Sequence, residues 1–284
     1  MPNTSAYAYK LFIFPHNNDL VNTTLKLKLS QFVRKLTNSL VYSKRLPREL
    51  GGGKVRVSPR SDLRFLYPGL TRMGSDLFQV AELYVLKDQC IWDLGANLGI
   101  FSFAAAWKTG SGGKVYAIEA DPFYADLIHK TQSRLPAGYG KVTPLCAAVA
   151  DRMGLLELCI PVRGHSRNHL AEVTGNSPGE TASVKQVCAV TGDFLVKSWP
   201  KPDLVKIDIE GAEHLFFRGA SELIKTMRPI FYVEVSEENT DEITSILLSN
   251  DYELFQIGEN GEEMPLERCQ FNTLAKPKAR AVNS

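Results

Sequence analysis

The chain has 284 residues, of which 44% are hydrophobic and 23% charged, and its formal net charge is +2. These values exclude a low-complexity or intrinsically disordered chain and allow one large α/β domain with an appendage. No segment approaches the roughly 18–20 consecutive apolar residues of a membrane span. The first residues lack the basic and then long apolar pattern of a secretory signal, so we do not expect one.

The five cysteines are widely spaced, odd in number and free of any CxxC pair. This pattern argues against a disulfide framework and against a zinc site, and it favours reduced thiols in a cytoplasmic protein.

The N-terminal part of the chain is basic. Residues 1–60 contain eleven Lys and Arg but two Asp and Glu, a formal charge of +9, which leaves −7 for the remainder. Apolar residues recur at helical spacing through 25–41 with basic residues between them, which predicts an amphipathic helix. The three glycines at 51–53 indicate a break, so we expect a basic N-terminal extension over 1–60 and one domain over 61–284. The pattern leaves open whether this extension packs on the domain, touches a membrane surface or another anionic partner, or is simply solvated.

From residue 90 onward, short apolar runs alternate with helical stretches of 10–15 residues. Such alternation predicts βαβ units and a mostly parallel sheet, which binds ligands outside the carboxyl ends of its strands. The expected strands contain the segments CIWDLG, KVYAIEA, VTPLCAAVA, PDLVKIDI, PIFYVEV, YELFQI and QFNTLAK.

Residues 151–190 interrupt this alternation. Two expected strands, ELCIPV and VKQVCAV, flank a polar loop that contains His165 and His169. A loop of this length inside a compact domain is usually functional or disordered, and it is a candidate substrate lid.

The segment IWDLGANLG, residues 91–99, places Asp93 at the end of a strand and two glycines, Gly95 and Gly99, in the turn that follows. Glycines allow positive φ and close approach of a ligand. The loop does not match the GxGxxG dinucleotide fingerprint, and a carboxylate beside it fits a cationic ligand such as S-adenosylmethionine better than a pyrophosphate. Glu119 follows Gly99 by 20 residues, the spacing at which an acid accepts hydrogen bonds from ribose hydroxyls.

A second acidic segment, VKIDIEGAE, spans residues 205–213. Strand alternation puts Lys206, Asp208 and Glu210 on one face, and a lysine in a buried strand needs a carboxylate, for which Asp208 or Glu210 is available. Glu234 lies near the carboxyl end of the next expected strand, so it should reach the same edge of the sheet. These acids suit a general base, a divalent cation site or a sugar hydroxyl site, or else a structural ion network around Lys206.

The chain resembles the FkbM-type family of class I S-adenosylmethionine-dependent methyltransferases. The resemblance lies in four segments taken together: WDLGANLG, VYAIEADP, PDLVKIDIEGAE with RGA after it, and FYVEV. The resemblance spans roughly residues 80–275. It implies a Rossmann-like, seven-stranded, mostly parallel sheet whose last strand is antiparallel. It also implies S-adenosylmethionine as methyl donor and O-methylation of a hydroxyl on a sugar, glycan or secondary metabolite.

The resemblance also implies cofactor contacts. The methionine end would lie on the glycine loop, the ribose on Glu119, and the adenine near the segment that begins at Ala147. The implied cofactor-binding residues are Asp93, Gly95, Ala96, Asn97, Gly99, Glu119 and Ala148. The candidate catalytic residues, Asp208, Glu210 and Glu234, rest on the residues themselves. No metal ligand is assigned, and the need for a divalent cation stays open.

Rival functions remain. The basic arm suits a nucleic-acid methyltransferase, and the nucleoside site alone suits a non-catalytic scaffold, whereas the departure from GxGxxG disfavours an NAD dehydrogenase. The chain lacks an NPPY-like motif for amine acceptors and a Pro-Cys nucleophile for attack at a base carbon. A small-molecule or glycan hydroxyl is therefore the preferred acceptor over nucleic acid, and the oligomeric state stays open.

Overall fold

The computed structural model describes residues 39–70, 75–161, 169–172 and 181–279, together with residues 33, 36 and 37. Most of the expected amphipathic helix and His165 lie outside these residues. None of the helices in the described ranges has the length and hydropathy of a bilayer-spanning segment.

The central element is a sheet of eight strands, and the expected α/β class with a mostly parallel sheet is confirmed. Its strand order is β13-β12-β14-β11-β10-β3-β4-β5, and the run from β11 to β5 is parallel. Strand β14 is antiparallel to both of its neighbours. The strands are β3 (Cys90–Leu94), β4 (Lys114–Glu119), β5 (Lys141–Cys146), β10 (Leu204–Ile207), β11 (Ile230–Glu234), β12 (Tyr252–Ile257), β13 (Glu263–Leu266) and β14 (Asn272–Pro277).

The eighth strand, β13, differs from the expected seven. The chain after β12 turns back at Gly261, whose φ is +85°, and pairs antiparallel with β12. Because this segment contains Pro265, its sequence argues against a central strand; the sheet edge is the position where a proline is tolerated.

Helices cover both faces of the sheet, and strand alternation divides the core accordingly. Ile91 packs with the cluster formed by α2, α3 and α4, whereas the next residue, Trp92, packs with the cluster formed by α6 and α7. The helices are α2 (Ser75–Tyr84), α3 (Ile100–Thr109), α4 (Pro122–Gln132), α5 (Gly192–Ser198), α6 (Glu213–Arg218) and α7 (Thr240–Ser249), with shorter turns at Arg48–Leu50, Leu63–Leu66, Leu223–Met227 and Glu237–Asn239.

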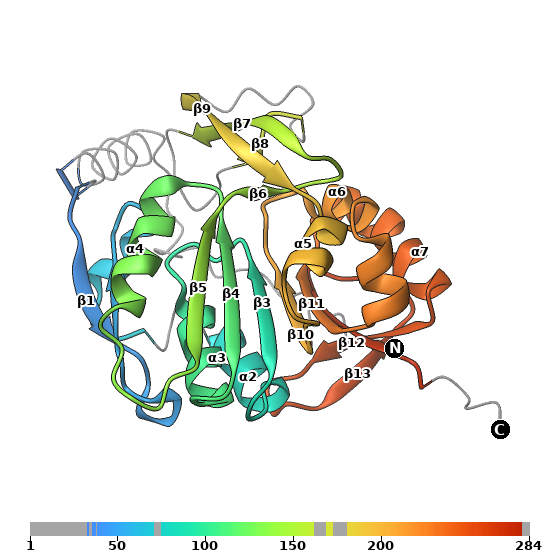
Figure 1. Cartoon of the computed structure of the whole chain (residues 1–284), viewed down its shortest axis with the longest axis horizontal. Helices are drawn as coiled ribbons and strands as arrows, with labels where there is room; N and C mark the ends of the chain where they lie inside the picture. Colours follow the sequence, from blue (N-terminus) through green and yellow to red (C-terminus); the bar gives the residue numbers. More distant parts are fainter. Residues whose placement is uncertain are drawn as a thin grey trace, which may run out of the picture.

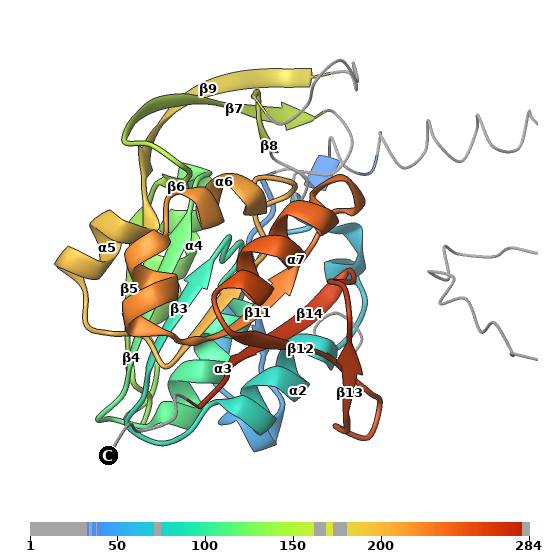
Figure 2. The same cartoon turned by 90° about the vertical axis from the view of Figure 1, so that its right-hand side faces the viewer.

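A small second sheet stands above the carboxyl ends of the central strands (Figures 1 and 2). The two strands expected on either side of the polar loop are present as an antiparallel pair, β7 and β9. The inner side chains of this pair pack against Leu215 of α6. The role of the loop as a lid stays a prediction. The strands of this sheet are β6 (Ala148–Val149), β7 (Gly154–Pro161), β8 (His169–Leu170) and β9 (Thr181–Val190).

The described part of the N-terminal extension forms a hairpin of β1 (Tyr42–Arg45) and β2 (Lys54–Val57), with the glycines in the connection. Val55 and Val57 are fully buried in the same core as α3 and α4. The hairpin therefore packs on the domain, beside α4 (Figure 1). The boundary near residue 60 stays a prediction.

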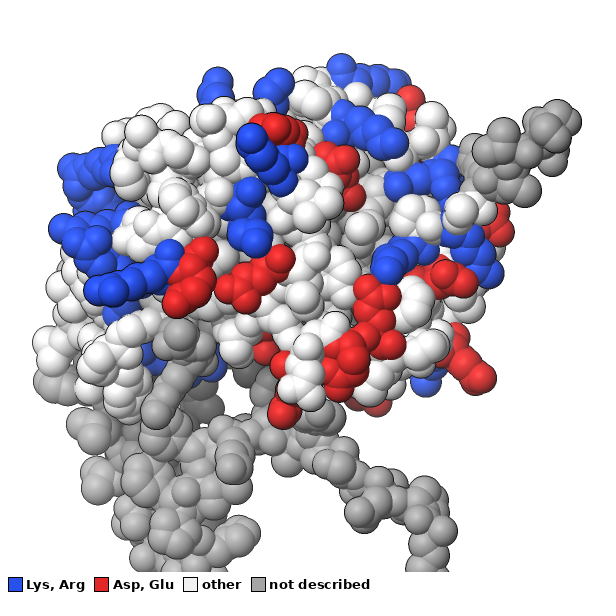
Figure 3. All heavy atoms as spheres, turned by 90° about the horizontal axis from the view of Figure 1, so that it is seen from below, with Lys and Arg blue, Asp and Glu red and all other residues white. Residues whose placement is uncertain are grey.

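Seen from below, basic side chains lie along the left edge, the top and the right of the described surface (Figure 3). Acidic side chains gather at the lower right of the same face.

Candidate active site

A cavity of about 820 Å³ lies at the carboxyl ends of the central strands. The structure brings eight of the ten predicted site residues to its wall, from both the glycine loop and the acidic segments. They are Gly95, Ala96, Asn97, Glu119, Ala148, Asp208, Glu210 and Glu234. Asp93 and Gly99 do not line the cavity. His169 pairs with Cys159 in the small sheet and is also absent from the wall.

Gly95, directly after β3, packs against the backbone of Asp208, directly after β10. Its φ is +75°, and a Cβ atom there would lie 1.7 Å from the carbonyl oxygen of Asp208. Any other residue would push the two strands apart. The glycine is therefore required by strand packing directly beside the cavity.

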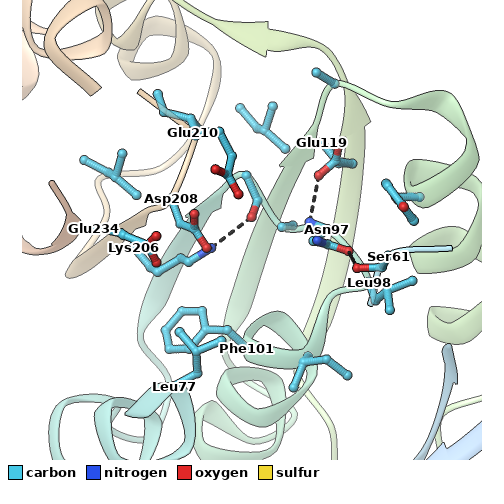
Figure 4. A pocket seen from close by; sticks show the side chains of 18 of the residues that line it. Ser61, Leu77, Asn97, Leu98, Phe101, Glu119, Lys206, Asp208, Glu210 and Glu234 are labelled. Atoms are coloured by element: carbon cyan, nitrogen blue, oxygen red, sulfur yellow. Dashed lines mark hydrogen bonds and ion pairs between the residues drawn. The ribbon is translucent and has the colours of Figure 1, made fainter. Parts of the chain in front are cut away.

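Asp93 and Lys206 form a buried charge pair behind the cavity wall. Lys206 Nζ lies 3.2 Å from Asp93 Oδ1, and it donates a 2.9 Å hydrogen bond to the Gly95 carbonyl oxygen. It also lies 3.5 Å from Asp208 Oδ2 (Figure 4). Asp93 Oδ2 also accepts from the Ser102 hydroxyl at 2.5 Å. Burial lowers the pKa of Lys206, but the charges of Asp93 and Asp208 outweigh it and raise the pKa above its usual value. The sequence suggested Asp208 or Glu210 as the partner of Lys206, and the pairing with Asp208 is confirmed. Asp93, which was expected to face the cofactor, is instead a second partner of the lysine.

Glu119 is fixed by backbone donors. Its two carboxylate oxygens accept hydrogen bonds from the Asn97 amide at 2.7 Å (Figure 4) and from the Asp121 amide at 2.8 Å. Asn97 has a φ of +50°, and its side-chain oxygen accepts a 2.9 Å hydrogen bond from the Ser61 hydroxyl. Burial raises the pKa of Glu119 to about 7, although these backbone donors oppose the shift. Each carboxylate oxygen has remaining acceptor capacity for a ligand hydroxyl.

Asp121 ties two distant segments to this end of the cavity. It caps α4, where its side chain accepts from the Phe123 amide, and it is fully buried. Arg60 lies 3.4 Å from one of its oxygens and Lys185 of β9 lies 3.0 Å from the other. The sequence marks Asp121 only as a helix cap before a proline, and nothing local predicts that Arg60 and Lys185 reach it.

The three candidate catalytic acids come together as expected. Asp208 and Glu210 follow β10, and Glu234 ends β11, so that all three side chains lie in one view of the cavity (Figure 4). Burial raises the pKa of Glu234 to about 9, and the nearby charges of Asp208 and Glu210 add to the shift, while Lys206 opposes it. Glu234 is therefore largely protonated at neutral pH.

The turn after β10 is held tightly. Glu210 has a φ of +51° and Gly211 one of +92°. The buried Glu213 accepts from the Gly211 amide at 2.9 Å, and Asn239 donates to the Gly211 carbonyl oxygen at 2.7 Å. A strained backbone fixed in this way is typical of functional sites.

Several wall residues lie outside every motif. Ser61 comes from the N-terminal hairpin region, Asp76 from the start of α2, and Phe271 and Asn272 from the entry to β14. Asn272 is the register partner of Glu234, which explains its position. No sequence signal near these residues marks them, because long-range packing alone brings them to the cavity.

Among the described residues, no three His, Cys, Asp or Glu side chains group as a metal site.

Comparisons with known proteins relate the sequence to methyltransferases. The sequence model of the methyltransferase FkbM domain matches residues 93–254, more than half of the chain. The hexuronic acid methyltransferase AglP of Haloferax volcanii is 24% identical over 163 residues, which are 57% of this chain and 62% of that protein. The chain thus matches less than two thirds of that relative's length.

Solved structures with a similar fold are distant. The methyltransferase FkbM from Methylobacillus flagellatus KT has 16% sequence identity and a TM-score of 0.45, covering 70% of this chain and 47% of that one. A SAM-dependent methyltransferase from Aquifex aeolicus has 13% identity and a TM-score of 0.43, covering 76% and 97%. Because the family model covers more than half of the chain, and the matched range includes the glycine loop and the acidic turn on the cavity wall, this chain belongs to the methyltransferase FkbM domain family.

Proposed function

We propose that the protein transfers a methyl group from S-adenosylmethionine to a hydroxyl oxygen of a sugar, a glycan or another hydroxylated small molecule. The observation that carries this proposal is the pairing of two sites in one cavity. The glycine loop and Glu119 lie on one side, and Asp208, Glu210 and Glu234 lie on the other. The relative named as a hexuronic acid methyltransferase also supports a sugar acceptor.

The cavity fits this cofactor. Glu119 offers a carboxylate held by two backbone amides, which suits the two hydroxyls of a ribose. The segment Ala147–Val149 contributes an apolar wall suited to a purine ring. Asp208 and the loop carbonyls offer acceptors for an ammonium group, and a cationic sulfonium is favoured beside several carboxylates. Asp93 would act indirectly by holding Lys206 and, through it, the Gly95 carbonyl.

When bound, S-adenosylmethionine supplies its sulfonium methyl group, and the carbon–sulfur bond breaks as the oxygen–carbon bond forms. The protein must align the acceptor hydroxyl and remove one proton. Glu234 suits that second role in its ionised form, because a carboxylate with a raised pKa is a stronger base than an ordinary one, and its ionised fraction grows as the pH rises toward 9. Asp208 and Glu210 maintain its basicity and offer acceptors to neighbouring hydroxyls of the substrate.

The test is methyl transfer from labelled S-adenosylmethionine to a panel of glycosides and hydroxylated small molecules, with the methyl ether located by mass spectrometry. Glu234→Gln should keep cofactor binding, measured by calorimetry, and lose most of the transfer. Glu263→Gln, which alters an acid paired with Lys276 at the far edge of the sheet, is the matched control and should keep both. Cofactor binding without transfer to any acceptor would favour the non-catalytic scaffold. Equal turnover by Glu234→Gln would remove Glu234 as the base.

A further inference from the structure

The end of the cavity away from Glu119 is built around Glu234. Asn272 is the register partner of Glu234, and its side-chain nitrogen lies 3.5 Å from Asp76 Oδ2. Leu77 and Phe271 add apolar surface to the same wall, and Phe271 is 44% exposed. An exposed aromatic ring beside carboxylate and amide groups suits a polyhydroxylated ring with one apolar face, so this end is where we place the acceptor.

The described wall of the cavity is strongly acidic. Six of its residues are acids and two are bases: Asp62, Asp76, Glu119, Asp208, Glu210 and Glu234 against Arg64 and Lys206. Even with Glu119 and Glu234 protonated, the acids outnumber the bases. A cavity lined by one sign of charge concentrates ligands of the opposite sign and repels those of the same sign.

Both bases are already engaged by the protein. Arg64 lies 2.7 Å from Asp62, and Lys206 lies 3.2 Å from Asp93. Lys206 also lies 3.5 Å from Asp208, so its single charge is shared between that wall acid and Asp93, which is outside the cavity. A substrate carboxylate or phosphate would therefore find no uncommitted cation among the described wall residues.

We infer that the acceptor carries no anionic group near its reacting hydroxyl, and that an ammonium group there improves it: the acceptor class is a neutral or amine-bearing glycoside. This inference rests on the proposed function and narrows it. It separates the chain from the relative named for a hexuronic acid, whose acceptor name implies a carboxylate. The bound cofactor adds one net positive charge, which reduces the excess of acids without reversing it.

The first experiment compares three acceptors of the same ring shape: methyl glucoside, its 2-amino analogue and methyl glucuronide. At saturating cofactor, kcat/KM should fall in the order amine, neutral, uronate, with about tenfold or more between the extremes, and high salt should compress the series. Asp76→Asn should reduce the difference in kcat/KM between the amine and the uronate. Asp126→Asn, which alters an exposed acid of α4 paired with Lys130, should leave it unchanged. Preference for the uronate would overturn the inference.

The second experiment needs no acceptor. In the full-length protein with Cys146→Ser and Cys188→Ser, which remove the two exposed thiols, Phe271→Cys places a thiol at the acceptor end. A cationic and an anionic methanethiosulfonate should then react at rates that, relative to a free thiol, favour the cation by about tenfold. Equal rates would overturn the inference even if no sugar is methylated. A cation preference with cofactor binding but no methylation would instead count against the proposed function.

Discussion

The ammonium of Lys206 and the carboxylate of Asp93 lie 3.2 Å apart with side chains 4% and 0% exposed. This pair joins the two motifs that place the chain in its family, because Asp93 precedes the glycine loop and Lys206 precedes the acidic turn. The lysine also donates to the carbonyl oxygen of Gly95. The geometry of the glycine loop thus depends on this charge pair, of which Lys206 lines the cavity and Asp93 does not.

Asp93→Ala should destabilise the fold by roughly 3–5 kcal/mol, because it leaves the buried Lys206 without its nearest carboxylate. Urea unfolding followed by tryptophan fluorescence measures this loss. Cofactor affinity should fall as well, through displacement of the loop.

The control is the double variant Asp93→Leu with Lys206→Met, which removes both charges and keeps apolar volume. It should be more stable than Asp93→Ala. If both variants lose the same free energy of unfolding, desolvation of the lysine is not the cause.

Gly95→Ala should be far more damaging than an ordinary glycine substitution. A Cβ atom at Gly95 meets the Asp208 carbonyl oxygen at 1.7 Å, whereas Gly110, with a similar φ of +68°, has nothing within 4 Å of the same position. Gly110→Ala should cost only backbone strain, about 1–3 kcal/mol, because its φ of +68° and ψ of −176° lie in a region that glycine alone adopts readily. Circular dichroism and thermal unfolding of both variants compare the two costs. Similar losses would show that backbone strain alone, and not strand spacing, accounts for the Gly95 effect.

Much of this architecture was predictable from local pattern. The alternation of strands and helices predicts the parallel sheet, and β10 and β11 bring Asp208 and Glu234 to one edge because parallel strands end together. The motif also predicts that Lys206 is buried and paired. Asp208, two residues along the same segment, was available as a partner from the motif itself. The pairing of Lys206 with Asp93 depends on the register of β3 against β10, where the two residues lie opposite each other.

The remaining features depend on contacts between distant parts of the chain. Ser61 reaches Asn97 because the β1–β2 hairpin packs on α4, and Lys185 reaches Asp121 because the small sheet folds over the strand ends. Neither contact is indicated by the periodicity or the composition of the sequence around these residues. The edge strand β13 was not predicted for a different reason, because it contains Pro265 and a proline argues against strand structure.

Ser61→Ala should weaken cofactor binding moderately. Its hydroxyl donates to the side-chain oxygen of Asn97, whose amide in turn holds Glu119. Loss of one such hydrogen bond is worth about 0.5–1.5 kcal/mol, which corresponds to roughly a 2–10-fold higher Kd in calorimetry. Ser198→Ala, which removes a hydroxyl bonded to the Phe194 carbonyl on α5, is the control and should leave the Kd unchanged. An unchanged Kd for Ser61→Ala would mean that Asn97 holds its conformation without the hairpin.

Glu234 should make both stability and activity depend on pH. Its pKa is about 9 in the folded protein against an ordinary value of 4.5, so the folded state binds the proton more tightly than the unfolded chain does. The stability that Glu234 contributes is fully present below pH 4.5 and is lost as pH rises toward 9. The glutamine of Glu234→Gln stays neutral at every pH. As pH rises from 4.5 to 9, the melting temperature of this variant should therefore increase relative to that of the wild type.

The same ionisation should appear in the rate. If Glu234 removes the hydroxyl proton, wild-type kcat/KM should rise with pH up to about 9 and then level off. Glu234→Gln should retain little activity and lose this dependence. A wild-type profile that is flat from neutral pH to 9, together with the expected change in melting temperature, would separate the two roles. Glu234 would then titrate as a buried carboxyl while another group, with Asp208 the nearest candidate, accepts the proton.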